Sequence, residues 1–174
     1  MQKSVPNTEC IHCSNRYRSI FCGLEEKYLH ILAENKGCST YRKDHVVFSE
    51  GAFPHGLYCV SYGKVKISKL GDGGKEQIVR LAREGDMIGY RALLSGEQYS
   101  CSATVIAESA ICFIPRNVIA DLLEGNPAFS MHIIKRLSVD LGKAENRLTD
   151  LAQKPVRERL AEAKANHAAA RAQF

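Results

Sequence analysis

The sequence predicts an α+β protein that is mainly β: an antiparallel double-stranded β-helix, or jelly roll, flanked by a short N-terminal helix and a long C-terminal helix. Three observations support this prediction. Short β-branched and aromatic runs separated by glycine turns occupy residues 40–115. A segment with helical apolar spacing precedes them. Residues 127–153 then form a run with no proline after its first residue and with Gly142 as its only glycine.

The composition is that of an ordinary globular protein. The chain has 174 residues, 45% of them hydrophobic and 25% charged, which excludes disorder and a collagen-like structure. Its apolar runs are far shorter than the roughly 20 residues of a membrane-spanning helix, and its first ten residues lack the apolar core of a secretory signal. We therefore expect a cytoplasmic protein with no membrane partner. The net charge of +5 is spread along the chain and is only weak evidence for nucleic-acid binding.

The first helix is expected at residues 24–33, after a short, polar segment that carries cysteines. Leu24, Tyr28, Ile31 and Leu32 recur there at helical spacing, which indicates one amphipathic helix. Gly37 marks the end of this pattern, because glycine is common just past a helix terminus.

Six short strands are expected in the middle of the chain, with turn signals between them. Lys64–Ser68 alternates polar and apolar side chains, and the glycine-rich turn after it predicts a hairpin with Gln77–Leu81. Tyr62-Gly63 is interpreted as a turn before that hairpin. The expected strands cover residues 46–48, 57–60, 64–68, 77–81, 103–106 and 111–114.

A long helix is expected from Asn126-Pro127 onward, because an Asn side chain caps free amides and Pro suits the first helical position. Apolar residues then recur at alternating spacings of four and three, a heptad seam that favours a parallel homodimer. A helix packed wholly on its own domain is the alternative. Lys154-Pro155 ends the helical pattern. The expected interface residues are Leu137, Leu141, Ala144, Leu148 and Leu151.

Several fragments together resemble the Crp/Fnr family of bacterial transcription regulators, across about residues 10–162. Glu50-Gly51, Gly63–Lys66, Gly85–Gly89 and Ile111–Pro115 follow the order and spacing of that family's cyclic-nucleotide-binding β-roll. A long heptad helix and then Arg157-Glu158-Arg159-Leu160-Ala161 come after them, as in the family. The resemblance implies a β-roll that senses a small effector, a helix that dimerises and a winged helix-turn-helix that binds DNA.

The resemblance divides the chain into four parts. Beyond Ala161 the alanine-rich sequence lacks the apolar periodicity of further helices, so we expect DNA binding to reside in a domain absent from this chain, whether by nature or by truncation. The parts are a cysteine-bearing segment at 1–23, an effector-sensing β-roll at 24–125, a dimerisation helix at 126–154 and a remnant of the first DNA-domain helix at 155–174.

The residues expected at the effector pocket argue against cyclic nucleotides. Relatives that bind them have a Glu for the ribose hydroxyl and a downstream Arg-Ser pair whose Arg binds the phosphate. Tyr90 stands at the Glu position, Ser100-Cys101 replaces the Arg-Ser pair, and Arg91 lies on the wrong side of the connecting segment to replace that arginine simply. We expect no cAMP binding, and another effector stays possible. The predicted pocket comprises Gly85, Asp86, Gly89, Tyr90, Arg91 and Ser100.

Four cysteines resemble the ligands of an iron–sulfur cluster. In the oxygen-sensing branch of the family, three N-terminal cysteines and one on a β-roll strand hold a [4Fe–4S] cluster. The resemblance assigns this role to Cys10, Cys13, Cys22 and Cys112, although the spacing here is C-x2-C-x8-C where that branch has C-x2-C-x5-C. Zinc at these cysteines and ordinary unliganded thiols are the alternatives.

The remaining cysteines are expected to be reduced and to serve packing. The chain has seven cysteines and no secretory signal, and the cytosol keeps thiols reduced, so structural disulfides are not expected. Those assigned to packing are Cys38, Cys59 and Cys101.

Three functions follow from these patterns. The leading hypothesis is the sensor and dimerisation module of a Crp/Fnr-type regulator that responds to oxygen or redox state through the cluster. The second is a β-roll regulator domain that binds a small effector without a cluster. The third is a cupin-like enzyme, which requires a His/Glu metal cage that this sequence does not supply. No catalytic motif is present, so we expect that the chain is not an enzyme.

Overall fold

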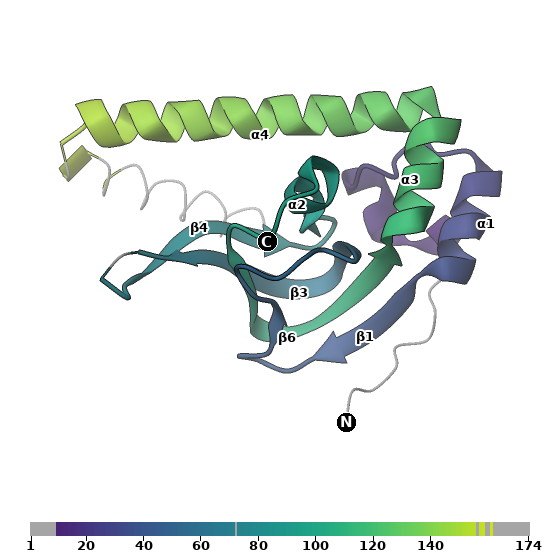
Figure 1. The fold of residues 1–174 in the computed structure, drawn as a ribbon, viewed down its shortest axis with the longest axis horizontal. Helices are drawn as coiled ribbons and strands as arrows, with labels where there is room; N and C mark the ends of the chain where they lie inside the picture. The colour runs from purple at the N-terminus through teal and green to yellow at the C-terminus, as the bar shows by residue number, and fades with distance from the viewer. Residues whose placement is uncertain (1–9, 72, 156, 159–160, 162–174) are drawn as a thin grey trace. The chain divides into compact units, whose positions relative to one another are not determined.

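The computed structural model describes residues 10–71, 73–155, 157–158 and 161. Two compact units divide the chain, Met1–Ser130 and Met131–Phe174. The first unit contains the β-roll and its flanking helices, and the second contains most of the long helix (Figure 1).

The first unit is built around one antiparallel sheet, as the sequence predicts. Its strands are ordered β1-β6-β3-β4, with β2 paired to β6 and β5 paired to β3. The hairpin expected at residues 64–81 is confirmed, since Lys64 pairs with Arg83 and Leu70 with Glu76. The strands are β1 (Gly37–Tyr41), β2 (Val46–Phe48), β3 (Gly56–Leu70), β4 (Glu76–Arg83), β5 (Met87–Ile88) and β6 (Ser102–Pro115).

The turn expected at Tyr62-Gly63 is absent, because β3 runs through it as one long strand. β6 is likewise one strand where the sequence suggested two. Gly63 lies inside β3 with a φ of 92°, at a point where the register with β6 shifts. A Cβ at this position would collide with the side chain of Ser109, so the position requires glycine. The glycine that looked like a turn is therefore a β-bulge.

The helices of the first unit include two that the sequence analysis missed. The expected N-terminal helix is present as α1 (Glu26–Asn35), preceded by the 3₁₀ turns η1 (Cys10–His12) and η2 (Ser14–Arg18). The unexpected helices are α2 (Tyr90–Ser95) and α3 (Arg116–Gly125). On α3, Val118, Ile119 and Leu122 are buried at helical spacing.

The long helix α4 (Pro127–Gln153) begins and ends as predicted. The Asn126 side chain accepts a hydrogen bond from the Phe129 amide at 2.9 Å, which confirms the expected cap. Within the second unit, Leu141, Leu148 and Leu151 are each more than 60% exposed. The heptad seam thus presents large apolar side chains to solvent.

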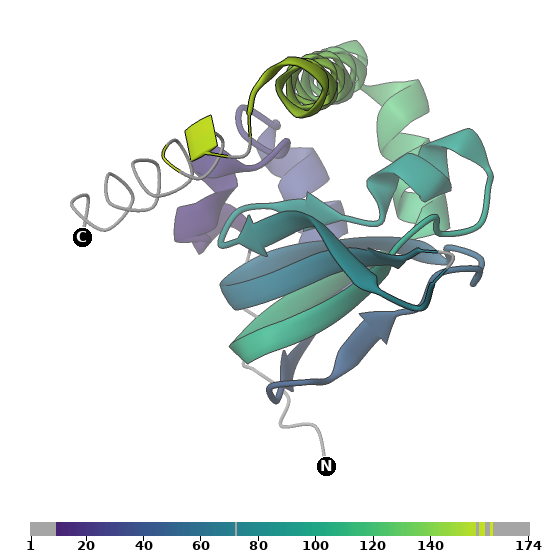
Figure 2. The same ribbon diagram turned by 90° about the vertical axis from the view of Figure 1, so that its left-hand side faces the viewer.

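The two faces of the sheet have different roles. The interior of the roll is filled by a cluster that includes Val60, Val65 and Ile111. The opposite face carries the α1 helix and the N-terminal turns, which lie on the same side of the curled sheet (Figure 2). Neighbouring residues on β3 and β6 point to alternate faces, so the residues next to Val60 and Ile111 face this second layer.

Candidate functional site: a cysteine-lined cavity

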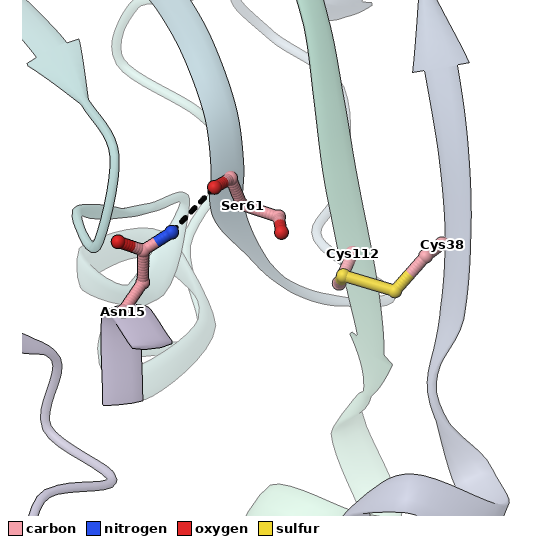
Figure 3. The surroundings of a disulfide bond; sticks show 4 residues. All are labelled: Asn15, Cys38, Ser61 and Cys112. Atoms are coloured by element: carbon pink, nitrogen blue, oxygen red, sulfur yellow. Dashed lines mark hydrogen bonds between the residues drawn. A yellow bond between two sulfur atoms is a disulfide. The ribbon is translucent and has the colours of Figure 1, made fainter. Parts of the chain in front are cut away.

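The N-terminal turns place the C-x2-C pair against the outer face of the sheet. The amide of Cys13 donates to the carbonyl of Cys10 at 3.4 Å, and the amide of Arg16 donates to the carbonyl of Cys13 at 3.0 Å. The Asn15 side-chain amide donates to the backbone oxygen of Ser61 on β3 (Figure 3). This contact ties the cysteine-bearing segment to the strand that also carries Cys59.

Three cysteines form one row across neighbouring strands. Cys38 of β1 lies directly opposite Cys112 of β6, and Cys112 lies directly opposite Cys59 of β3. Directly opposed residues of an antiparallel pair have their side chains on the same face and their β-carbons about 4.5–5.5 Å apart. The three sulfur-bearing side chains therefore lie on one face of the sheet.

Cys38 and Cys112 are joined by a disulfide (Figure 3). The expectation of seven reduced thiols, with Cys38 a mere packing residue, is therefore wrong for this pair. The physical reason is the cross-strand register, which brings two cysteines 74 residues apart in sequence into bonding range. The five remaining cysteines are free thiols: Cys10, Cys13, Cys22, Cys59 and Cys101.

A cavity of about 40 Å³ lies between the N-terminal turns, α1 and the sheet. Cys10 and Cys13 line it from the turns, and Cys59 and Cys112 line it from the sheet. Cys22 is not among its lining residues. The other lining residues are Asn15, Arg16, Ser19, Phe21, Leu29, Leu32, Lys36, Ser61 and Ile114.

Burial and neighbouring thiolates raise the pKa of Cys59 to about 12. Loss of solvation is the largest cause, and the negative charges of ionised Cys13 and Cys10 add to it. Without a bound metal, Cys59 is therefore a protonated thiol at neutral pH.

The predicted cluster ligands are only partly gathered. Cys10, Cys13 and Cys112 share the cavity, but the Cys112 sulfur is bonded to Cys38. Among the described residues, no group of three His, Cys, Asp or Glu side chains is arranged to hold a metal ion. Cysteine sulfur is the kind of donor that holds an iron–sulfur cluster, but Cys112 becomes a ligand only after the disulfide is reduced.

The predicted effector pocket is built on turns and on α2. Gly85 and Gly89 adopt φ values of 82° and 83°, which favour glycine. The Asp86 carboxylate accepts a hydrogen bond from the Arg83 amide at 3.0 Å and lies 3.9 Å from the Arg80 guanidinium. These contacts give Asp86 a structural role in the turn.

Aromatic side chains fill the space beside Gly89. The rings of Phe48 and Tyr99 stack with their centroids 3.9 Å apart, and a Cβ at Gly89 would lie 3.2 Å from the Tyr99 ring. Tyr90 is buried. The Arg91 guanidinium reaches across to donate to the Ser100 hydroxyl at 3.1 Å, on the exposed surface. The structure thus brings Arg91 and Ser100 together, despite their separation by the connecting segment.

The fold and its turns are those of a cyclic nucleotide-binding domain, and comparison with known proteins agrees. The family model described as "Cyclic nucleotide-binding domain" matches residues 38–126. An uncharacterised protein of Haemophilus influenzae is 32% identical over 111 residues, which are 64% of this chain and 84% of that protein. The chain belongs to the cyclic nucleotide-binding domain family and is Crp/Fnr-like.

Named regulators are among its relatives. The CRP-like cAMP-activated global transcriptional regulator of Mycobacterium tuberculosis is 27% identical over 132 residues, covering 76% of this chain and 59% of the regulator. The fumarate and nitrate reduction regulatory protein of Vibrio cholerae is 28% identical over 120 residues, covering 69% and 48%. The chain thus spans about half of the length of these two relatives.

Solved structures support the same fold. The sensor domain of the transcriptional regulator DNR from Pseudomonas aeruginosa superposes with a TM-score of 0.70 at 20% identity, covering 81% of this chain and 95% of that one. The catabolite activator protein of Thermus thermophilus superposes with a TM-score of 0.68 at 23% identity, covering 76% and 62%. Among the described residues, none of the helices is long and apolar enough to cross a membrane.

Proposed function

We propose that this chain is the sensor and dimerisation module of a Crp/Fnr-type transcriptional regulator and that it responds to oxygen or redox state through a cysteine-ligated [4Fe–4S] cluster. The observation that carries the proposal is the cavity whose lining includes Cys10, Cys13 and Cys112. Cys10 and Cys112, about a hundred positions apart in sequence, both line this cavity, and so does the Cys59 thiol on the sheet. Similarity to the fumarate and nitrate reduction regulatory protein of Vibrio cholerae and to the anaerobic regulatory protein of Bacillus subtilis supports the same function.

A cluster would supply sensitivity to oxygen, and this chain's own residues link its site to the long helix. The cysteine-bearing segment continues into Phe21, whose buried ring stacks on Phe129 in the first turn of α4 at 5.8 Å. The Tyr28 hydroxyl of α1 donates to the carbonyl of Gly125 at 2.7 Å, just before α4 begins. A shift of the N-terminal turns would therefore reach the start of the dimerisation helix.

Dimerisation and DNA binding complete the proposed regulator. We assign self-association to the exposed heptad seam of α4, since large apolar side chains at heptad spacing are typical of a partner helix. DNA recognition would belong to a helix-turn-helix domain of the whole regulator rather than to the β-roll. The protein would then act as a homodimeric switch and not as an enzyme.

The test is anaerobic reconstitution with iron, sulfide and a thiol reductant that opens the Cys38–Cys112 disulfide. We expect brown protein with about four iron and four acid-labile sulfide per chain, and colour that bleaches in air. Cys13→Ser should abolish iron binding, whereas Cys101→Ser, at a free thiol outside the cavity, should not. Colourless protein without iron after this treatment would show that the chain holds no cluster.

A second candidate function is a β-roll that binds a small effector and holds no cluster. The hydrogen-bonded pair of Arg91 and Ser100 favours it, because a guanidinium beside a hydroxyl suits an anionic group. Thermal-shift screening of small anions separates the two functions. An effector that stabilises the iron-free protein, and loses its effect in Arg91→Ala, would support this candidate.

A further inference from the structure

The row of cysteines on the sheet includes a thiol that the family resemblance does not use. Cys59 lies directly opposite Cys112 in the pairing of β3 with β6. Val60 and Ile111, which also pair, point to the interior of the roll instead. Cys59 therefore faces the N-terminal turns on the same side as Cys112.

The cavity contains Cys59 and does not contain Cys22. Two sulfur atoms of its wall come from the turns, at Cys10 and Cys13, and two come from the sheet, at Cys59 and Cys112. The chain passes out of the cavity after Phe21, and the Cys22 amide is held by the carbonyl of Ser19 at 3.2 Å. Three thiols and the disulfide-bonded sulfur of Cys112 thus line one space. Reduction of the disulfide brings the number of thiols to four, which is the ligand count of a [4Fe–4S] cluster.

Two basic side chains on the same wall suit a negatively charged group. Arg16 and Lys36 both line the cavity. The Arg16 Nε atom is buried and, among the described residues, has no hydrogen-bond partner. A buried donor without an acceptor is costly. Sulfide or thiolate of a bound cluster would provide that acceptor and would be stabilised by both cations.

We propose that Cys59, and not Cys22, supplies the fourth thiolate, so that Cys10, Cys13, Cys59 and Cys112 form the ligand set. This inference rests on the proposed function, because it names the ligands of the same cluster. It departs from the pattern implied by the resemblance at one position. The longer spacing between Cys13 and Cys22 is consistent with this, since Cys22 is then free of the requirement to reach the metal.

Cys10, Cys13 and Cys112 belong to both candidate ligand sets. The experiment therefore compares single serine variants of the other three thiols, Cys22, Cys59 and Cys101. Wild type, Cys59→Ser, Cys22→Ser and Cys101→Ser are reconstituted anaerobically under reductant, and iron, acid-labile sulfide and visible absorption are measured. We expect Cys59→Ser to bind at least fivefold less iron than wild type, and Cys22→Ser and Cys101→Ser to match wild type. Far-UV circular dichroism checks that each variant is folded.

Cys22→Ser tests the choice of the fourth ligand even if Cys59→Ser fails to fold. Loss of iron in Cys22→Ser would overturn the inference, whatever the other variant does. Full loading of Cys59→Ser together with loss in Cys22→Ser would leave the cluster function intact and return the fourth ligand to Cys22. Wild-type protein without iron or sulfide would refute the proposed function itself, and the inference with it.

Discussion

Opening the Cys38–Cys112 disulfide should destabilise the iron-free protein by a measurable amount. The bond joins residues separated by 74 positions. In the chain-entropy model, closing a loop of that length removes about 15 cal/mol/K of entropy from the unfolded chain, or about 4.5 kcal/mol at 25 °C. We take this value as the upper limit, and typical disulfides contribute about 2–4 kcal/mol.

The assay is unfolding in guanidinium chloride with and without dithiothreitol. With a slope of about 4 kcal/mol per molar, a loss of 2–4.5 kcal/mol lowers the midpoint by about 0.5–1 M. Reductant should lower the wild-type midpoint to that of Cys38→Ser and should leave the variant unchanged. Cys101→Ser is the matched control, because it removes a free thiol away from the bond, and we expect it to change stability by less than about 0.5 kcal/mol.

A thiol count provides an independent readout. The denatured, unreduced protein should expose five thiols, and the reduced protein should expose all seven. Seven thiols before reduction, or equal midpoints with and without dithiothreitol, would refute the reasoning and show that the register of β1 and β6 leaves the two sulfurs unbonded.

Three other predictions concern the pocket, the seam and the bulge. cAMP and cGMP should bind with dissociation constants of millimolar or weaker, about −4 kcal/mol, because Tyr90 is buried at the position of the ribose acceptor; micromolar affinity in calorimetry would contradict this. Leu141→Asp should weaken dimerisation at least tenfold in sedimentation equilibrium, since burying a leucine contributes about 1.5–3 kcal/mol; an unchanged dimer would place the interface elsewhere. Gly63→Ala should cost about 2 kcal/mol or more in stability from strain and collision with Ser109, whereas Gly74→Ala, with a φ of 71° but open space, should cost about 1 kcal/mol. Equal losses in the two variants would show that the collision contributes nothing.

Local patterns allowed much of the fold to be predicted. The alternation of Lys64–Ser68 and the glycine-rich turn after it predicted the hairpin, and the Asn126 side chain predicted the start of α4. Each of these signals lies within a few residues of the structure it specifies. The helix α3 was missed because Pro115 and the strand before it suggested that the β region simply ended there.

The cysteines show where a local pattern is insufficient. Cys59 lies in an apolar stretch of sequence and Cys38 in a short, mostly polar one, and in neither place does a single cysteine differ from a small packing residue. Their roles depend on the register of β1, β6 and β3, which joins segments that are far apart in the chain. Alternation within Leu57–Val60 does place Cys59 on the face opposite to Val60, but only the paired strand reveals Cys112 beside it.

Cys112 lies between Cys38 on one neighbouring strand and Cys59 on the other. Its sulfur can either form the disulfide with Cys38 or serve as a ligand in the cavity, but not both at once. Cys112 lines the cavity in either state, but while it is bonded to Cys38 its sulfur cannot act as a thiolate ligand. Under the proposed function, a chain oxidised to the disulfide would stay unloaded after oxygen is removed. Loading would begin once two thiols, or one dithiol, had reduced the bond by thiol–disulfide exchange and had themselves been oxidised to a disulfide. The regulator would then show hysteresis, because the rate at which it regains its cluster would depend on the concentration of cellular thiols as well as on oxygen.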